Sequence, residues 1–174
     1  NTLSTVTLDG SSSSDPDGDL PLTYLWTQVA GTPVLLSSTT SPTPTFTAPG
    51  DPSSLSFTLV VTDSLGAPST PDEVVITVNN QAPVADAGDD QSVDTLASVA
   101  LSGGGSDPDG DTPLAYQWAQ TGGTTVELSD QTAVNPTFTA PADPGTLTFS
   151  LVVTDSFGLS SAPDEVVTTV NNQA

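Results

Sequence analysis

The chain repeats itself once, at an interval of 92 residues. The stretch Ser14–Asp19, with the sequence SDPDGD, returns unchanged at Ser106–Asp111, and three further stretches return with the same spacing. Aligning 14–82 with 106–174 needs no gap and leaves 46 of 69 positions identical. This period is that of a whole small β-domain, and it is too long for one turn of a solenoid. The repeat therefore predicts tandem domains.

The two copies differ at their beginnings. We expect a first repeat at 1–80, a second repeat at 81–172 and the start of a further repeat at 173–174. The first copy has no counterpart of Pro83–Val93, the opening segment of the second. This favours a window cut from a longer array of repeats. The alternative is that a neighbouring chain supplies the missing strand, as in donor-strand complementation.

Proline and glycine interrupt the chain every 8–12 residues, and β-branched residues fill the intervals, as in an all-β sandwich. Apolar and polar residues alternate over 55–62, which predicts a strand with Leu55, Phe57, Leu59 and Val61 on its core face. About seven strands are expected in a complete domain. In the second copy they include Val84–Asp86, Ser98–Ser102, Val126–Leu128, Thr137–Thr139 and Val166–Val170.

Each copy contains one tryptophan, Trp26 or Trp118, on a strand with apolar neighbours of the same parity. A tryptophan in a binding module can form a platform on which a sugar stacks. A sandwich this small, however, needs one large residue at its centre. We therefore expect both tryptophans in the core.

The charges are all of one sign. The chain has 21 carboxylates and no lysine, arginine or histidine, so its net charge is -21. Nucleic acid and anionic membrane surfaces are poor partners because both require basic residues. No apolar run is long enough to cross a bilayer. Without histidine, cysteine or lysine, the usual nucleophile–base pairs of enzymes are absent, although paired aspartates as in glycosidases stay formally open.

Three aspartates alternate in each SDPDGD stretch, at positions 15, 17 and 19 and at positions 107, 109 and 111. Glycine and proline predict a tight turn there, on which the carboxylates repel one another unless a cation lies between them. Calcium suits such a cluster because it binds six to eight hard oxygens. Asp63 and Asp155 have the same parity as the core residues of their strands, so we expect their side chains to point inward. In an Ig-like topology they would lie at the same end of the domain as the acidic turn. The alternative is that these aspartates cap turns by accepting backbone N–H groups.

Taken in order, these motifs resemble the PKD (polycystic-kidney-disease) family. The matching stretches are APVADAG at 82–88, SDPDGD, Tyr-x-Trp, PTFTAP and LVVTDS-x-G. The resemblance implies an Ig-like β-sandwich, with the first domain lacking its N-terminal strand. In some members calcium binds near the linker between domains, and the implied ligands in the second copy are Asp107, Asp109, Asp155 and an oxygen of Asn80. In the first copy they are Asp15, Asp17 and Asp63, while Asp19 and Asp111 are added by the spacing alone.

This resemblance predicts a structural function. The expected role is that of a calcium-stiffened spacer in a long extracellular or cell-surface protein, such as an adhesin, a surface layer or a filament. Its partners would be neighbouring repeats of the same chain or of a homopolymer, and a glycan or surface protein could be a ligand. No catalysis is expected. The alternative is an accessory module of a secreted hydrolase that binds carbohydrate or protein.

Overall fold

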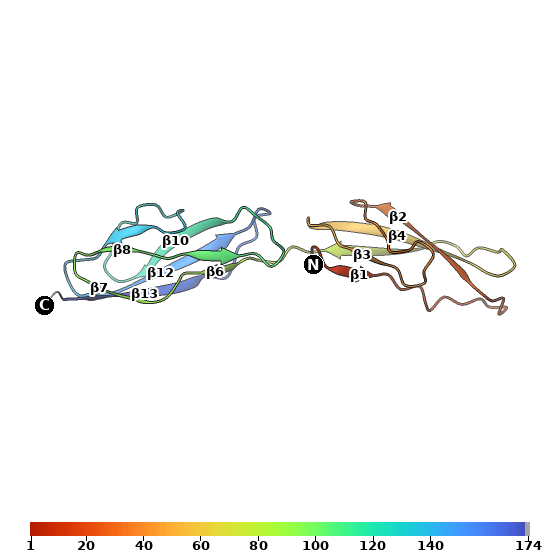
Figure 1. Ribbon diagram of the computed structural model, residues 1–174, viewed down its shortest axis with the longest axis horizontal. Helices are drawn as coiled ribbons and strands as arrows, with labels where there is room; N and C mark the ends of the chain where they lie inside the picture. The colour runs from red at the N-terminus through yellow and green to blue at the C-terminus, as the bar shows by residue number, and fades with distance from the viewer. Residues whose placement is uncertain (173–174) are drawn as a thin grey trace. The chain divides into compact units, whose positions relative to one another are not determined.

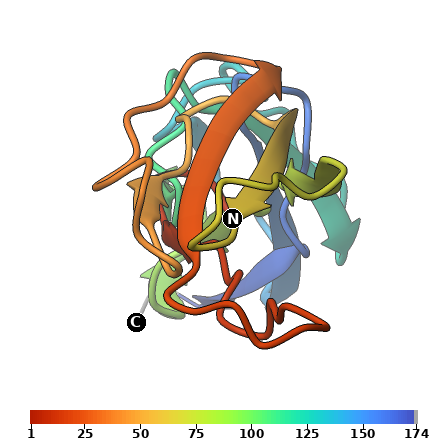
Figure 2. The ribbon, with the colours of Figure 1, turned by 90° about the vertical axis from the view of Figure 1, so that its right-hand side faces the viewer.

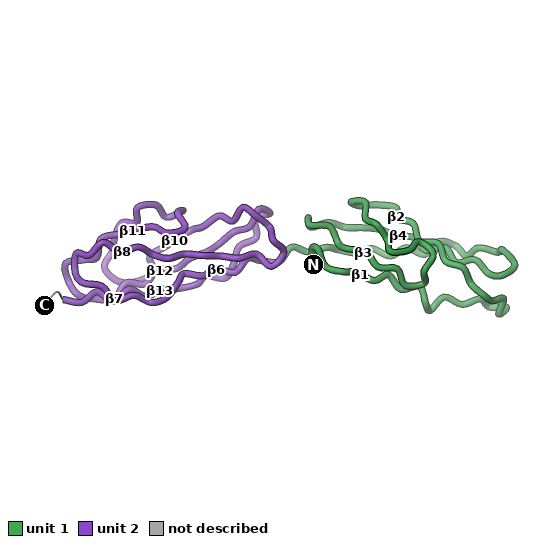
Figure 3. The backbone as a smooth tube through the Cα atoms, viewed as in Figure 1, with its two compact units in different colours: residues 1–80 green, residues 81–174 purple. Residues whose placement is uncertain are grey.

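The computed structural model describes residues 1–172, and these form 13 β-strands and no helix (Figure 1). The chain divides into two compact units, with the boundary between Asn80 and Gln81 (Figure 3). The expected start of a further repeat, at 173–174, lies outside the described residues. The all-β prediction is confirmed.

Unit 1 contains five strands in two sheets. The larger sheet has the order β2-β4-β5, and the smaller one pairs β1 with β3. All of these pairings are antiparallel. Figure 2 faces the end of unit 1, and the long connection from β1 to β2 forms a red-orange loop there. The strands are β1 (Thr5–Thr7), β2 (Thr23–Ala30), β3 (Thr45–Thr47), β4 (Ser53–Thr62) and β5 (Asp72–Val78).

Unit 2 contains eight strands in three sheets. The largest has the order β10-β12-β13-β7, in which β7 pairs with β13 in parallel and the other pairings are antiparallel. The other sheets pair β11 with β8 and β6 with β9. The strands are β6 (Val84–Asp86), β7 (Gln91–Asp94), β8 (Ser98–Ala100), β9 (Gly104–Ser106), β10 (Ala115–Gly122), β11 (Thr137–Thr139), β12 (Gly145–Thr154) and β13 (Asp164–Asn171).

The cores of the two units are built alike. Trp26 stands opposite Leu59 across the β2–β4 ladder, and Trp118 stands opposite Leu151 across the β10–β12 ladder. Both tryptophans are buried, at 4% and 0% exposure. A tilted pair of phenylalanine rings lies in each core, with centroids 5.1 Å apart in unit 1 and 4.9 Å apart in unit 2. Burial of these large apolar side chains is the main source of stability in such small domains.

The strand expected at Val126–Leu128 is wrong. Val126 and Leu128 pack on the core, which explains their alternation with polar neighbours. The backbone at 126–128 is paired with no strand. The N–H of Val126 donates instead to the side-chain oxygen of Gln120, at 2.9 Å, and so is not available for a backbone ladder. The alternation thus reflected burial of side chains without a ladder of backbone hydrogen bonds.

Two short strands of unit 2, β7 and β9, were not expected, and the strand expected at 98–102 ends at Ala100. Both additional strands are short, and β7 has only one apolar residue, Val93, which packs against the core. In β9 a side chain is disfavoured, since a Cβ on Gly105 would lie 3.1 Å from the methyl groups of Val153. Hydrophobic patterning therefore could not reveal them, and unit 2 has eight strands where about seven were predicted.

Candidate metal centre

The acidic turn of unit 2 joins the end of β9 to the start of β10. One oxygen of Asp107, Oδ1, accepts the backbone N–H groups of Asp109 at 2.8 Å and of Asp111 at 3.1 Å. The turn is closed by the N–H of Gly110, which donates to the carbonyl of Asp107 at 3.2 Å, and Gly110 has a φ of 81°. A positive φ of this kind favours glycine, which explains its place in the motif.

This backbone course brings the three carboxylates together. Oxygens of Asp107, Asp109 and Asp111 all lie within 4.8 Å of one another. The exposed fractions are 6% for Asp109 and 9% for Asp111. The second oxygen of Asp107, Oδ2, is buried and accepts no hydrogen bond from the described residues. Two carboxylates at this separation repel by roughly 3–4 kcal/mol at an effective dielectric constant of about 20.

Unit 1 carries the same turn with the same hydrogen bonds. Oδ1 of Asp15 accepts the N–H groups of Asp17 at 2.8 Å and of Asp19 at 3.1 Å, and the three carboxylates again lie within 4.8 Å of one another. The difference is burial, because Asp17 is exposed whereas its counterpart Asp109 is buried. Repulsion in unit 1 is therefore better screened by water.

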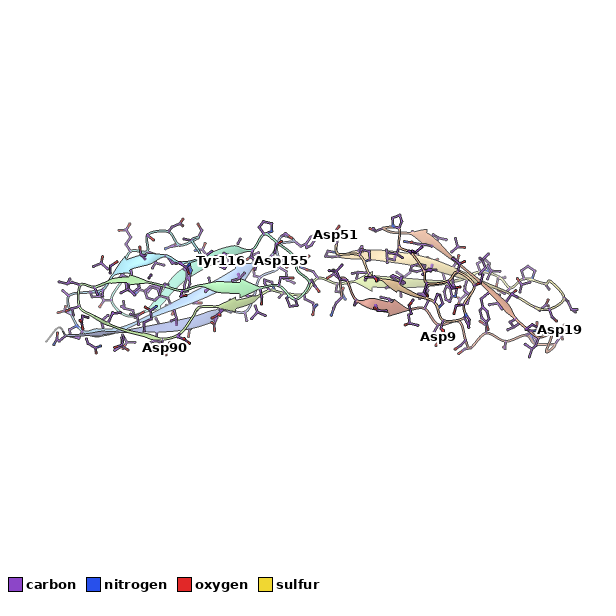
Figure 4. The ribbon with its side chains drawn as sticks, in the orientation of Figure 1. Asp9, Asp19, Asp51, Asp90, Tyr116 and Asp155 are labelled. Atoms are coloured by element: carbon purple, nitrogen blue, oxygen red, sulfur yellow. The ribbon has the colours of Figure 1, made fainter. Side chains whose placement is uncertain are left out.

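Asp63 and Asp155, the two aspartates that were expected to point inward, lie at the same end of their units as the acidic turns. Asp155 directly follows Thr154, the residue that pairs with Ala115 at the start of β10, and it is 6% exposed (labelled in Figure 4). In unit 1, Asp63 and Asp15 line one hollow. Oδ1 of Asp155 accepts the N–H groups of Phe157 and Leu159, each at 2.9 Å. Asp155 is not among the carboxylates grouped within 4.8 Å of one another, so its place as a ligand remains a prediction.

Gln81, the first residue of unit 2, reaches into this cluster. Its backbone N–H donates to Oδ2 of Asp109 at 2.6 Å, and its side-chain amide donates to Oδ1 at 2.5 Å. The sequence reasoning missed Gln81, although Asn-Asn-Gln-Ala is one of the repeated stretches. Asn80, which was predicted to supply an oxygen, is the last residue of unit 1, and its role as a ligand also remains a prediction.

Two exposed aspartates show how a turn-capping carboxylate behaves in this chain. The N–H and hydroxyl of Thr132 donate to Asp130, and they lower the pKa of that carboxyl below its ordinary value. Ser11 lowers the pKa of Asp9 through its side chain first and its N–H second. Both lie in water, whereas Asp109 and Asp155 are buried. The acidic turn of unit 2 therefore differs from a simple cap in its burial and in its crowding.

Other features of a binding site are sparse. Of the nine aromatic residues, Phe157 alone is exposed, at 47%, and its counterpart in unit 1 is Leu65. No helix within residues 1–172 is long and apolar enough to cross a membrane.

The topology of the two units and their acidic turns define a tandem pair of Ig-like β-sandwich modules. The chain belongs to the family described as K319L-like, PKD domain, whose model matches residues 2–78 and 87–170. PKD domains often serve as structural or accessory modules, and their Ig-like fold is typically non-catalytic.

Parts of this chain are similar to known proteins. Chitinase A of Pseudoalteromonas piscicida is 37% identical over 110 residues, which are 61% of this chain and 13% of that protein. The solution structure of the PKD domain from KIAA 1837 protein is 27% identical, covers 56% of this chain and 94% of that one, and has a TM-score of 0.46. Drosophila N-cadherin EC1-3 is 13% identical, covers 92% of this chain and 58% of that one, and has a TM-score of 0.44. The chain thus spans a small part of the chitinase.

Proposed function

We propose that this chain is a structural part of an extracellular or cell-surface protein, in which tandem repeats act as spacers and calcium stabilises them. The observation that carries the proposal is the acidic turn of unit 2. There three carboxylates crowd together, two of them are buried, and Oδ2 of Asp107 has no hydrogen-bond donor among residues 1–172. The chain has no basic side chain that could neutralise them.

Calcium fits this donor set by its chemistry. It prefers hard oxygens, and it accepts carboxylates in a flexible geometry together with carbonyl and water oxygens. Asp107, Asp109 and Asp111 would hold the ion, and the ion would replace their mutual repulsion with attraction. Asp155 and Asn80 complete the predicted ligand set. The acidic turn of unit 1 is more exposed, so Asp15, Asp17, Asp19 and Asp63 would form a weaker site.

Ordering of this turn by calcium would stiffen the chain where it enters unit 2. Gln81 is held by two hydrogen bonds to Asp109, so an ion that fixes Asp109 also fixes the first residue of the unit. A spacer gains from this because a fixed linker limits the motion of successive repeats. Neighbouring repeats of the same chain or of a homopolymer are the proposed partners.

Calcium titration calorimetry on the whole chain tests the metal centre. We expect a tight site that Asp107→Asn abolishes and a weaker one that Asp15→Asn abolishes, with magnesium binding less well at both. Small-angle scattering then tests the spacer. The distribution of interatomic distances within the chain, obtained from the scattering, should narrow in calcium and broaden in chelator. Binding without any change in scattering would support a metal site and refute the stiffening.

A second candidate function is an accessory module of a secreted hydrolase, with a glycan or a surface protein as its ligand. The match to chitinase A favours it, and Phe157 is the exposed aromatic residue that could contact a sugar. Retention on chitin or on a glycan array that is lost in Phe157→Ala would support this role. Its counterpart variant Leu65→Ala in unit 1 is the matched control.

A further inference from the structure

Each unit has a groove along one side of its smaller sheet. In unit 2 the groove has a volume of about 720 Å³ and lies between β11 and residues 124–129 (β11 is labelled in Figure 3). In unit 1 a groove of about 530 Å³ lies between the end of β3 and residues 32–35, the counterparts of 124–127. Ligand sites in proteins typically have volumes of roughly 300–1,000 Å³. The groove recurs in the repeat, and it is separate from the acidic turn.

One wall of the groove in unit 2 is the outer edge of β11. The N–H of Ala140 donates to the carbonyl of Ala97 at 2.8 Å, and the carbonyl of Pro136 accepts the N–H of Leu101 at 2.9 Å, so the even-numbered residues bond on the side of β8. Successive residues of a strand turn their backbone groups to opposite edges. The N–H and carbonyl of Thr139 therefore face the groove, and no hydrogen bond reaches them from residues 1–172.

The opposite wall is a segment that leaves β11 after one point of contact. The N–H of Ser129 donates to the carbonyl of Thr137 at 2.8 Å, and the N–H of Thr137 donates to Oγ of Ser129 at 2.9 Å. Continuing this antiparallel register by two residues would pair Glu127 with Thr139. The two backbones diverge instead, and both residues line the groove. The groove is thus a gap between two backbone edges.

A glutamine side chain holds the second wall away from β11. Nε2 of Gln120, near the end of β10, donates to the carbonyl of Thr124 at 2.8 Å, and its Oε1 accepts the N–H of Val126 at 2.9 Å. These two bonds fix the segment beside β10. The segment therefore does not close onto β11, and the gap stays open.

Unit 1 builds its groove with the same contacts. Gln28 donates to the carbonyl of Thr32 at 2.8 Å and accepts the N–H of Val34 at 2.9 Å. The N–H of Ser37 donates to the carbonyl of Thr45 at 2.8 Å, and the N–H of Thr45 donates to Oγ of Ser37 at 2.9 Å. Four hydrogen bonds with the same lengths thus shape the groove in both copies.

The rims of the two grooves differ in charge. Glu127 and Asp143 are exposed at the groove of unit 2. Asp51 lies at the corresponding place in unit 1 (labelled in Figure 4), but the counterpart of Glu127 is Leu35, which is 91% exposed. A charge at a sheet edge often blocks pairing with other chains. Leu35 is uncharged and open to solvent, so the groove of unit 1 has no such block at this position.

We propose that the groove is a docking site for an extended basic segment of another protein, which adds to the edge of β11 as a strand. The segment would pair with Thr139 on one side and with Glu127 on the other. In β-strand addition, backbone hydrogen bonds supply affinity and alternate side chains supply specificity. Lysine or arginine side chains of the segment would contact Glu127 and Asp143. This inference does not depend on calcium.

Charge complementarity identifies the occupant. The chain has 21 carboxylates and no basic side chain, so nothing within it competes for the carboxylates at the groove. A second copy of this chain is a poor occupant for the same reason, since it would bring a further charge of -21. An exposed ion pair strengthens binding by up to roughly fivefold. Unit 1 should therefore bind a basic segment more weakly than unit 2, and Leu35→Glu should strengthen its binding by a similar factor.

The test uses the whole chain and a synthetic peptide with blocked ends in which lysine alternates with valine, at about 0.15 M salt. Amide hydrogen exchange is followed by NMR at Thr139 and Glu127. With the peptide at ten times its dissociation constant for unit 2, exchange at both amides should slow roughly tenfold. The amides of Thr47 and Leu35 in unit 1 should slow less at the same concentration.

Two controls separate strand addition from the attraction of any basic peptide to this acidic chain. The same peptide with N-methyl groups at alternate residues keeps its charge but loses the hydrogen-bond donors along one edge, so it should not slow exchange at either amide. Glu127→Gln and Asp143→Asn should each weaken binding by up to roughly fivefold. Asp130→Asn removes a charge of the same unit outside the groove and should have no such effect.

Four results would overturn the proposal. The first is unchanged exchange at Thr139 with the peptide in large excess, and the second is equal slowing by the N-methylated peptide. The third is slowing that follows the concentration of the protein alone, which would identify a second copy as the occupant. The fourth is protection of the two amides by a chitin oligosaccharide and not by the peptide, which would identify a glycan site.

Discussion

Gln81 and Asp109 are joined by two hydrogen bonds, one from the backbone N–H at 2.6 Å and one from the side-chain amide at 2.5 Å. The pair ties the first residue of unit 2 to the middle of its acidic turn. Asp109 is buried, so these donors offset part of the free energy of removing its charge from water. The relationship links the course of the chain to the candidate metal centre.

Removal of the Gln81 side chain should destabilise unit 2. Gln81→Ala leaves the backbone hydrogen bond and deletes the one from the amide, and a bond to a charged group contributes about 1.5–3 kcal/mol. We expect a loss of this size in chelator, read from the slowest amides of β12, which report global unfolding of the unit. Gln117→Ala is the control, because that amide donates to the neutral carbonyl of Trp118. Equal effects of the two variants would contradict this role.

Thr168 offers a substitution that should stabilise the protein. Its side chain is 0% exposed, and its hydroxyl has no hydrogen-bond partner among the described residues. Thr168→Val keeps the shape and removes the unpaired polar atom, so unit 2 should gain roughly 1 kcal/mol. Chemical denaturation measures the change, and Thr169→Val on the exposed face of β13 should have little effect. A loss of stability in Thr168→Val would show that the hydroxyl is paired in solution.

Gly123 should tolerate no side chain. Its φ is +87°, and a Cβ there would lie 2.2 Å from the carbonyl oxygen of Thr146. Gly158 has nearly the same φ, +86°, with nothing within 4 Å of the added atom. Gly158→Ala should therefore lose about 1–2 kcal/mol from the backbone conformation alone. Gly123→Ala should lose clearly more, and a comparable loss in the two variants would mean that the loop relaxes.

The pKa of Asp9 should depend on Ser11. Because the pKa is lowered in the folded state, the stabilisation from this carboxylate is present above the unfolded pKa and is lost as pH falls through the folded pKa. Ser11→Ala removes the largest cause, so the pKa should rise toward its ordinary value. A carboxyl NMR titration measures it, with Asp130 as the internal reference. No rise would show that the backbone N–H alone holds the shift.

Much of the fold could be predicted because the two copies repeat the same pattern. The alternation of apolar and polar residues along β4 and β12 identified the core strands, and the single tryptophan of each copy lies in the core. The missed strands β7 and β9 have polar or glycine-rich sequences. They form because they fit beside β13 and β6, and a pattern of hydrophobic residues carries no information about such neighbours. The segment at Val126–Leu128 showed the reverse error, with an alternating pattern and no ladder.

The acidic turn could be predicted as a unit because its spacing and its glycine dictate the local backbone. The structure does bring Asp107, Asp109 and Asp111 together. Their unequal burial in the two units could not be predicted from nearly identical sequences. Nor could the contact of Gln81, which depends on the path of the chain into unit 2.

The most direct test of the central claim is the thermal unfolding midpoint of the chain in calcium and in chelator, at fixed ionic strength. Calcium at about 100 times its dissociation constant should add about 2.7 kcal/mol to the folded state of unit 2 and raise its midpoint. Asp107→Asn or Asp155→Ala should abolish this rise, and Asp107→Asn should not lower the midpoint in chelator, because it relieves repulsion. Asp130→Asn, at a capped turn of the same unit, should keep the full response. Equal midpoints in calcium and chelator, or a response that survives Asp107→Asn, would contradict a calcium centre at the acidic turn.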